Sequence, residues 1–239
     1  MLYLSRLILN LRDRSVQAML SDCHTMHSGL MTAFPAAPDP TRARDHFGVL
    51  YRVEQPEGTP TVRLIVQSQQ LPDWSIFPAR MLGPGPDQRG NPAVRSILDE
   101  IGQVQPGMQL RFRLRANPTK RVSKNNSEQD SKWHGKRIEL RREPEQLNWL
   151  ERKAQQSGFR LLQAQIGEDT ITDVQIGQAA KQRGRDLHSG HRMRFGVALF
   201  EGRLEVSDSS QFLAALQQGI GSGKAYGFGL LSIASLPGA

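Results

Sequence analysis

Apolar and polar positions along the first half of the chain follow the periods of strands and helices. The apolar stretch 3–9 predicts a buried strand at the start of the fold. Apolar residues three or four positions apart predict helices over 14–20 and 25–33. Apolar and polar residues alternate over 49–54 and 62–67, which predicts a pair of neighbouring strands.

The turn residues at 57–60 suit a hairpin connection between these two strands. A weak helical pattern over 93–101 and a clear strand pattern over 108–116 follow. Strand, helix, strand, strand, helix, strand is the order of a ferredoxin-like unit. We therefore expect an N-terminal ferredoxin-like domain over residues 1–121. The polar segment 122–132 cannot supply a core and is predicted to be a linker or loop.

The same order of elements recurs over 133–239. Helices are expected over 144–157 and after Asp208, a good N-terminal cap. The dipeptide Glu201-Gly202 suits a tight hairpin turn. Five strands are expected, over 136–140, 159–164, 192–200, 203–206 and 228–234. The prediction is an α+β protein of two tandem ferredoxin-like (βαββαβ, RRM-like) domains, with a glycine-rich loop in the second and no sequence repeat between the halves.

Positive charge is concentrated in one segment. The net charge is +8, and residues 111–142 hold eleven Lys or Arg against three acids, which leaves 20 basic and 20 acidic residues in the rest of the chain. A surplus gathered in one place indicates a polyanion-binding surface, whereas a surplus that serves solubility is spread over the whole molecule. Nucleic acid is the expected partner. A solvated basic loop remains the alternative.

The strand expected over 108–116 separates its side chains into two faces. A period of two places Arg111, Arg113 and Arg115 together on the face opposite the apolar residues. Because no acid alternates with them, we expect RNA phosphates to neutralise them. Further candidate RNA-binding residues are Asn117, Lys120, Arg121, Lys136, Arg137 and Arg160.

Five glycines fall within eleven residues near the C-terminus: Gly219, Gly221, Gly223, Gly227 and Gly229. The residue after Lys224 is Ala225 and the loop follows a helix, so the stretch is not a nucleotide-binding P-loop. We expect the backbone here to lie close to an RNA strand, with Lys224 adding charge. A helix C-cap with an ordinary loop is the alternative.

His24 and His27 are three positions apart and share a helical face if the helix expected over 25–33 begins slightly early. Imidazole can move protons near neutral pH, and RNA cleavage by a ribose 2′-OH needs a base and an acid. A structural role for the pair remains open, as does a zinc site with a distant third ligand. Cys23 is the only cysteine, so no intramolecular disulfide can form, which fits a reducing, cytoplasmic compartment. The apolar stretch 2–11 is too short to span a membrane.

With these residues in place, the chain resembles the CasE-type endoribonucleases of the RAMP superfamily, which process CRISPR transcripts in type I-E systems. The resemblance covers nearly the whole chain. It rests on segments 3–7, 26–27, 73–75, 110–121, 158–162, 199–206 and 219–231.

The resemblance implies a cytoplasmic enzyme that binds the hairpin of each CRISPR repeat and cuts at its 3′ base, without metal or other cofactor. It implies a 2′,3′-cyclic phosphate product and retention of the mature RNA with the other Cascade subunits. The family's catalytic histidine falls on His27. A tyrosine often found three positions earlier is His24 here, and a lysine sometimes found five positions later is Thr32. A non-catalytic RNA-binding subunit and a metal-dependent nuclease are the competing interpretations.

Overall fold

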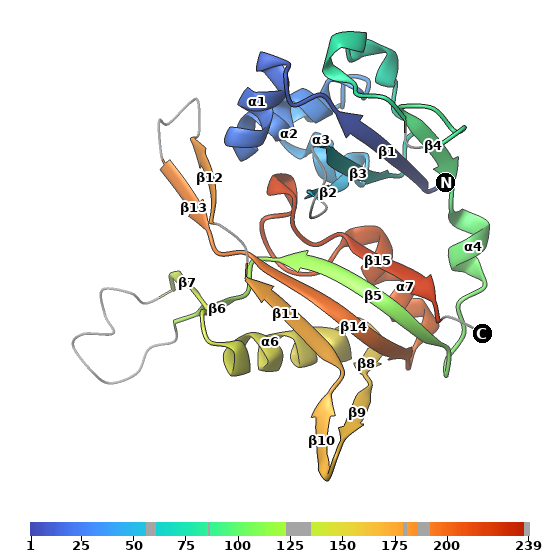
Figure 1. Cartoon of the computed structure of the whole chain (residues 1–239), viewed down its shortest axis with the longest axis vertical. Coiled ribbons are helices and arrows are strands. Elements are labelled where there is room, and N and C mark those ends of the chain that lie inside the picture. The colour runs from blue at the N-terminus through green and yellow to red at the C-terminus, as the bar shows by residue number, and fades with distance from the viewer. Residues whose placement is uncertain (56–60, 86, 123–134, 179–180, 186–191, 237–239) are drawn as a thin grey trace.

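The computed structural model describes residues 1–239 except 56–60, 86, 123–134, 179–180, 186–191 and 237–239. It is a mixed α+β fold in which two antiparallel sheets belong to two units, joined through helix α4 (Leu98–Gly102) (Figure 1). Among the described residues, none of the helices is both long and apolar enough to cross a bilayer.

The N-terminal unit contains a four-stranded sheet in the order β2-β3-β1-β4, with every neighbour antiparallel. Its strands are β1 (Tyr3–Leu9), β2 (Leu50–Glu54), β3 (Val62–Ser68) and β4 (Ala93–Ser96). Its helices are α1 (Arg14–Ser21), α2 (Cys23–Met31) and α3 (Ala43–His46). Leu7 and Leu64 from the sheet pack with Val16, Met26 and Leu30 from the helices, which forms the core of this unit.

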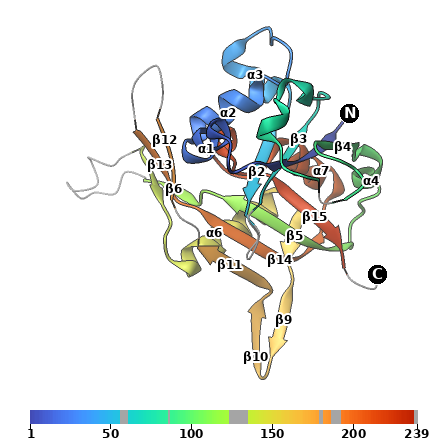
Figure 2. The same cartoon turned by 45° about the horizontal axis from the view of Figure 1, so that its top comes forward.

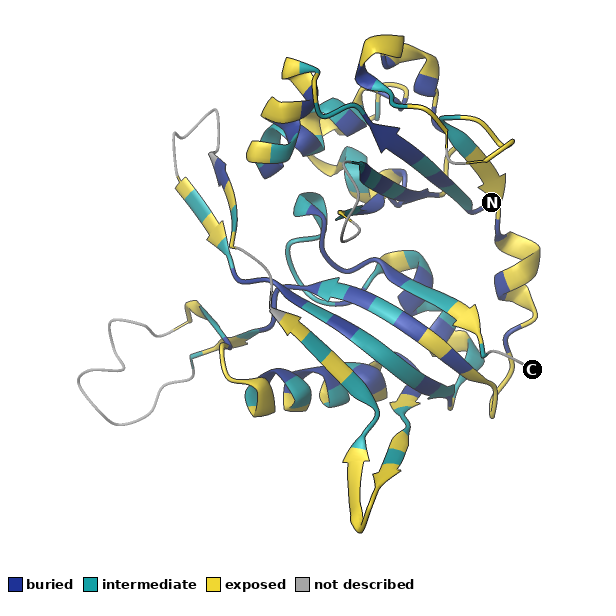
Figure 3. Cartoon of the chain, viewed as in Figure 1, coloured by how far each residue is buried: buried dark blue, intermediate teal, exposed yellow. Residues whose placement is uncertain are grey.

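The C-terminal unit contains a sheet in the order β11-β14-β5-β15, with the short strand β8 beside one end of β14. Its strands are β5 (Gln109–Ala116), β8 (Phe159–Leu161), β11 (Val174–Gln178), β14 (Ala198–Val206) and β15 (Leu231–Ser235). Helices α6 (Glu143–Gln156) and α7 (Ser209–Gln218) cover one face, where Trp149 and Phe212 share a core with Phe112, Leu114 and Phe200. Burial alternates along β5 and β14 in consequence (Figure 3).

Three two-stranded ribbons extend from this unit: β6 (Thr119–Arg121) with β7 (Arg137–Glu139), β9 (Gln163–Ile166) with β10 (Asp169–Thr172), and β12 (Gln182–Arg185) with β13 (Arg192–Phe195). The ribbon β12–β13 lies beside α1 and α2 in both views, and β12 contacts α2 (Figure 2). The ribbon β9–β10 projects from the opposite end of the molecule.

Several predicted elements are confirmed. β1 has the expected bounds. The bounds of α1, β2 and β3 each differ from the prediction by one residue at one end. Asp208 accepts a hydrogen bond from the Gln211 amide at the start of α7, as expected of a cap. The connection 57–60 and nearly all of the segment 122–132 lie outside the described residues.

The predicted place of the strand 108–116 is wrong. This strand, β5, pairs with β14 and β15 of the C-terminal sheet, so a boundary after residue 121 separates it from its own partners. The last strand of the N-terminal sheet is β4, at the start of the segment expected to be helical over 93–101, and the helical prediction is confirmed only for the end of this segment, in α4. A short β-branched stretch, with Val94, Ile97 and Ile101 among polar residues, fits either period, and pairing with β1 decides the outcome.

The predicted hairpin turn at Glu201-Gly202 is also wrong, because β14 runs through it without a break. Gly202 lies between Phe112 of β5 and Val174 of β11. A Cβ atom at position 202 would collide with the carbonyl oxygen of Asp173, so close approach of the neighbouring strand requires glycine here.

The two units are joined by a buried arginine. Arg52 of β2 is 4% exposed and binds Glu54 at 2.6 Å. Its Nη1 donates to the Leu230 carbonyl oxygen at 3.2 Å and to Ser232 Oγ at 3.0 Å, both in the C-terminal unit. Glu54 in turn accepts from Arg113 of β5 at 3.1 Å. This interface therefore depends on charged groups that satisfy one another.

Replacing Arg52 with Met should lower the free energy of unfolding by about 3–5 kcal/mol, because Glu54 loses its closest counter-ion and buried acceptors lose their donor. Urea unfolding followed by circular dichroism measures the change. Arg63→Met is the matched control, since Arg63 approaches the same carboxylate only to 3.8 Å and its side chain is 40% exposed. We expect the control to change stability by less than about 1 kcal/mol, and equal losses in the two variants would contradict the assignment.

Candidate functional site

Helix α2 brings the two candidate histidines together. It begins at Cys23, two residues before the predicted start, because Asp22 caps it by accepting from the amides of His24 and Thr25 at 2.9 and 2.8 Å. His24 and His27 are therefore one helical turn apart, and both side chains are partly exposed. Met26 and Leu30 on the same helix are buried and fix its orientation.

The glycine-rich loop packs against this helix. Its 3-10 turn η4 (Lys224–Tyr226) contacts α2 and β2, and the loop lies between the two units, in red in Figure 1. The hydroxyl of Tyr51 on β2 donates to the carbonyl oxygen of Ala225 at 3.1 Å. Gly227 has a φ of +80°, and a Cβ there would approach the Tyr51 ring to 2.9 Å. The glycines thus serve packing within the protein as well as any contact with RNA.

Positive groups surround His27. Burial, followed by the charges of Arg44 and His24, lowers the pKa of His27 to about 4. Burial also lowers the pKa of Lys224, and the charges of Arg44 and Lys153 lower it further. Groups from α2, α3, α6 and η4 therefore share one electrostatic environment, in which an anion would be stabilised.

A cavity of about 700 Å³ lies beside the same loop. Gly219, Gly221 and Lys224 line one side, and the ribbon β6–β7 and helix α6 line the others. Its cations are Arg121, Arg137, Arg152, Lys153 and Lys224. None of its described lining residues is Asp or Glu, so the cavity is suited to a polyanion.

The expectation that no acid of the protein meets the arginines of β5 is wrong for Arg113, and Arg115 also has partners within the protein. Arg113 binds Glu54 of β2 and, at 2.6 Å, Glu201 of the adjacent strand β14. The guanidinium carbon of Arg115 lies 4.8 Å from the centre of the Phe228 ring, and its Nη1 donates to the carbonyl oxygen of Gly227. Two acids from other strands therefore pair with Arg113, and the glycine-rich loop occupies Arg115, so these two arginines hold the interface and the loop.

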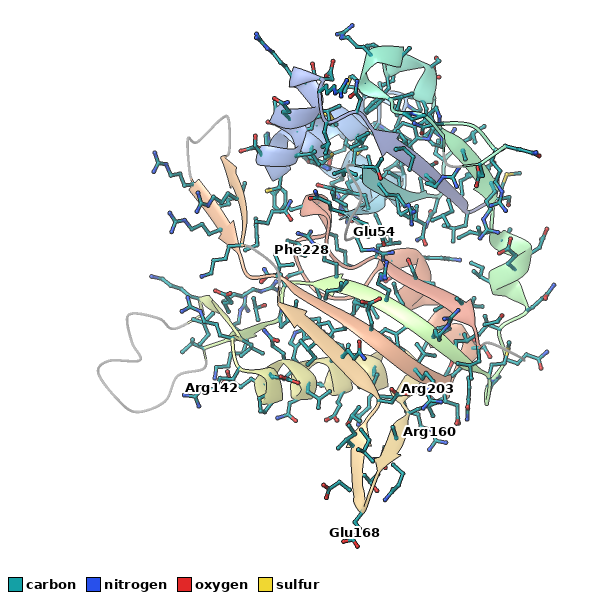
Figure 4. The ribbon with its side chains drawn as sticks, in the orientation of Figure 1. Glu54, Arg142, Arg160, Glu168, Arg203 and Phe228 are labelled. Carbon is teal, nitrogen blue, oxygen red and sulfur yellow. The ribbon has the colours of Figure 1, made fainter. Side chains whose placement is uncertain are left out.

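The remaining predicted residues divide by position. Arg121 and Arg137 line the cavity, whereas Lys120 pairs with Glu145 at 3.6 Å and Asn117 is buried. Arg111 and Lys136 are exposed, and Gly223 precedes η4. Arg160 binds Glu205 at 2.8 Å and lies with Arg203 at the end of the sheet away from Phe228, so the structure does not bring it to the site (Figure 4).

Several residues near the site were not predicted. Arg44 lies in a short helix after a proline-rich stretch and has no motif around it. Arg152 and Lys153 belong to a helix that was identified by its apolar face only. The segment 181–194 holds five Lys or Arg residues and one acid, Asp186. Acids elsewhere cancel this local surplus when charge is summed over all residues outside 111–142, so the sum does not reveal a second basic segment.

Of the remaining histidines, the structure describes only His46. His46 is exposed on α3, and His134, His188 and His191 lie outside the described residues. Within the part of the chain that the structure describes, no three His, Cys, Asp or Glu side chains gather as a metal-binding group.

Comparison with known proteins gives consistent matches over the whole chain. A family described as CRISPR associated protein matches residues 2–235. The CRISPR-associated endoribonuclease Cse3 of Thermus thermophilus is 35% identical over 239 residues, 98% of this chain and 100% of that protein. The CRISPR system Cascade subunit CasE of Escherichia coli is 31% identical over 238 residues, again 98% of this chain and 100% of that protein. A structure of the endoribonuclease Cse3 bound to 19-nucleotide RNA has a TM-score of 0.76 at 34% identity and covers 98% of this chain and 99% of its own.

The environment of His27 predicts a histidine that is neutral over the whole physiological range. Its pKa of about 4 in the folded protein lies below the value of about 6.5 in an unfolded chain. Between these values only the unfolded chain binds the proton, so the free energy of unfolding falls as the pH drops from about 6.5 to about 4.

An NMR titration of the histidine Cε1–H signals tests this directly. One signal, absent from the His27→Gln protein, should titrate with a midpoint near 4. A midpoint near 6.5 for that signal would show that Arg44 and the surrounding protein do not act on His27 as described.

Proposed function

The chain belongs to the family of CRISPR-associated endoribonucleases that includes Cse3 and CasE, and from this premise we propose that it cuts CRISPR precursor RNA. Its substrate is the hairpin of each repeat, cut at the 3′ base, and it retains the mature RNA as a Cascade subunit. The observation that carries the proposal is that the helix of His27 contacts the glycine-rich loop, and that this loop lines a cavity with five cations.

His27 is the principal acid-base residue in this proposal. As a neutral imidazole it can accept the proton of a ribose 2′-OH, and the 2′-oxygen then attacks the adjacent phosphorus. The bond from phosphorus to the 5′-oxygen breaks and the departing oxygen takes up a proton from water, which leaves a 2′,3′-cyclic phosphate and a 5′-hydroxyl; the imidazolium of His27 then returns its proton to the solvent. His24, one turn away, orients the 2′-OH or assists proton transfer. Both groups act on protons alone, so the reaction proceeds without metal.

The RNA stem follows the positive surface. The cavity beside the glycine-rich loop places Arg121, Arg137 and Lys224 where phosphates of one strand can bind in succession. The ribbon β12–β13, with Arg192 and Arg194 exposed, extends this surface alongside α2. A-form stems are recognised mainly by shape and backbone contacts, which suits a basic surface of this extent.

Both units are proposed to be ferredoxin-like. The strand orders β2-β3-β1-β4 and β11-β14-β5-β15 each place the first and third strands in the middle of an antiparallel sheet. In the first unit, short 3-10 turns at Trp74–Ile76 and Ala79–Met81 occupy the place of the second helix. In the second unit, the ribbon β9–β10 divides the second strand into β8 and β11.

Replacing His27 with Ala should reduce single-turnover cleavage of the repeat hairpin by at least about 100-fold, because the proton acceptor is lost, while the Kd for the hairpin stays within about threefold. The assay contains EDTA, and the cut end is identified by its 2′,3′-cyclic phosphate. His46→Ala removes an exposed histidine from the same unit and should cut at the rate of the unaltered protein.

The outcomes separate the competing functions. If the unaltered protein binds the hairpin and leaves it intact, the chain is an RNA-binding subunit. If it cuts only when EDTA is omitted, a metal-dependent nuclease replaces the proposal. Undiminished cutting by His27→Ala would move the chemistry to another residue.

Replacing Arg121 and Arg137 together with Ala should weaken hairpin binding and reduce the slope of log K against log salt concentration by about 1.4–1.8, because two phosphate contacts are lost. Fluorescence anisotropy at several salt concentrations measures the slope. The matched control is Arg95→Ala, whose side chain on β4 pairs with Glu100 and lies outside the cavity lining. A slope equal in all three proteins would contradict this path for the RNA.

A further inference from the structure

Arg44 is an arginine near the proposed cutting site to which the function above gives no task. It lies on α3, and its side chain is only 17% exposed. Burial lowers its pKa, because the charged guanidinium loses part of its hydration. A guanidinium group is seldom buried in a protein unless it has a role in packing or in function.

The position of Arg44 is fixed by the residue just before β2, the strand that holds the glycine-rich loop. Its Nη1 donates to the carbonyl oxygen of Val49 at 3.1 Å. Two residues later, Tyr51 donates to Ala225 in η4. Because Lys224 precedes Ala225, one short stretch of backbone anchors Arg44 and the turn that carries Lys224.

The charges around Arg44 are positive on two sides. The pKa values of Lys224 from the loop and His27 from α2 are lowered first by burial and then by the charge of Arg44. The acid that pairs with Arg44 among the described residues is Asp45, its neighbour in sequence, whose side chain is 61% exposed and therefore well screened by water. A second anion, placed between Arg44 and Lys224, would be attracted by both cations.

We propose that Arg44 and Lys224 bind the non-bridging oxygens of the phosphate that is cut, which makes Arg44 a further catalytic residue. The inference rests on the proposed function, since it places the scissile phosphate next to His27. As the 2′-oxygen bonds to phosphorus and before the bond to the 5′-oxygen breaks, negative charge gathers on these non-bridging oxygens. A fixed guanidinium binds that charge more strongly in the transition state than in the substrate.

The test compares Arg44→Ala with the unaltered protein on three repeat hairpins: one natural, and two with a single sulfur in place of either non-bridging oxygen at the cut phosphate. Arg44→Ala should cut the natural hairpin at least about 100-fold more slowly. The unaltered protein should cut one of the two sulfur isomers more slowly than the natural RNA. The rate for the natural RNA divided by the rate for this isomer is the sulfur ratio, and it should approach one in Arg44→Ala. Binding is measured separately on a hairpin with a 2′-deoxyribose at the cut site, and should change by less than about threefold.

Two further variants keep the test decisive. Arg42→Ala removes an exposed arginine two residues away and should retain both the rate and the sulfur ratio of the unaltered protein. Arg44→Lys keeps a positive charge and is used in the same assays if Arg44→Ala has a lowered Tm. It should cut at an intermediate rate with a reduced sulfur ratio, because Lys lacks the two-pronged geometry of Arg.

The inference is overturned if the Arg44 variants cut at the normal rate, or if they cut slowly with an unchanged sulfur ratio, which would indicate an indirect role. Failure of the proposed function looks different, because the unaltered protein itself would then leave the natural hairpin intact.

Discussion

The packing of the glycine-rich loop between the two units is the contact on which the candidate site depends. Tyr51 of the N-terminal unit holds the loop through the carbonyl oxygen of Ala225, and Arg115 of the C-terminal unit holds it through Gly227 and Phe228. His27 comes from the first unit and Lys224 from the second. Neither unit alone presents both, so the site exists only where the units meet.

Burial determines what this junction can do. A histidine that water solvates freely is partly protonated at neutral pH, whereas burial and then the charge of Arg44 favour the neutral form of His27. A bound phosphate reverses part of this effect, because its negative charge favours the protonated imidazole. The same imidazole therefore becomes a better proton acceptor when RNA is in place, and substrate binding and proton transfer are coupled through charge alone.

The sequence predicts the local elements better than their assembly. Strand and helix periods locate β1, α1, α2 and α7 within a few residues, and the spacing of His24 and His27 identifies a real pair on one helix. The period of β5 is equally clear, yet nothing in it says which sheet it joins, because both sheets offer apolar partners. Arg44 could not be found from sequence, since its charge acts on His27 only in the folded chain.

The arginines of β5 show why alternating charge is weak evidence for an external partner. A period of two proves that one face of a strand is polar, but the counter-ions can come from any strand that the fold brings near. Here Glu201 lies opposite Arg113 on β14, and Glu54 reaches it from β2 of the other unit. The pair with Glu54 joins the two units, and a displacement of about 1 Å between catalytic groups can cost about 100-fold in rate. Arg113 thus supports the proposed cleavage by holding the junction in register, although it does not need to contact RNA to do so.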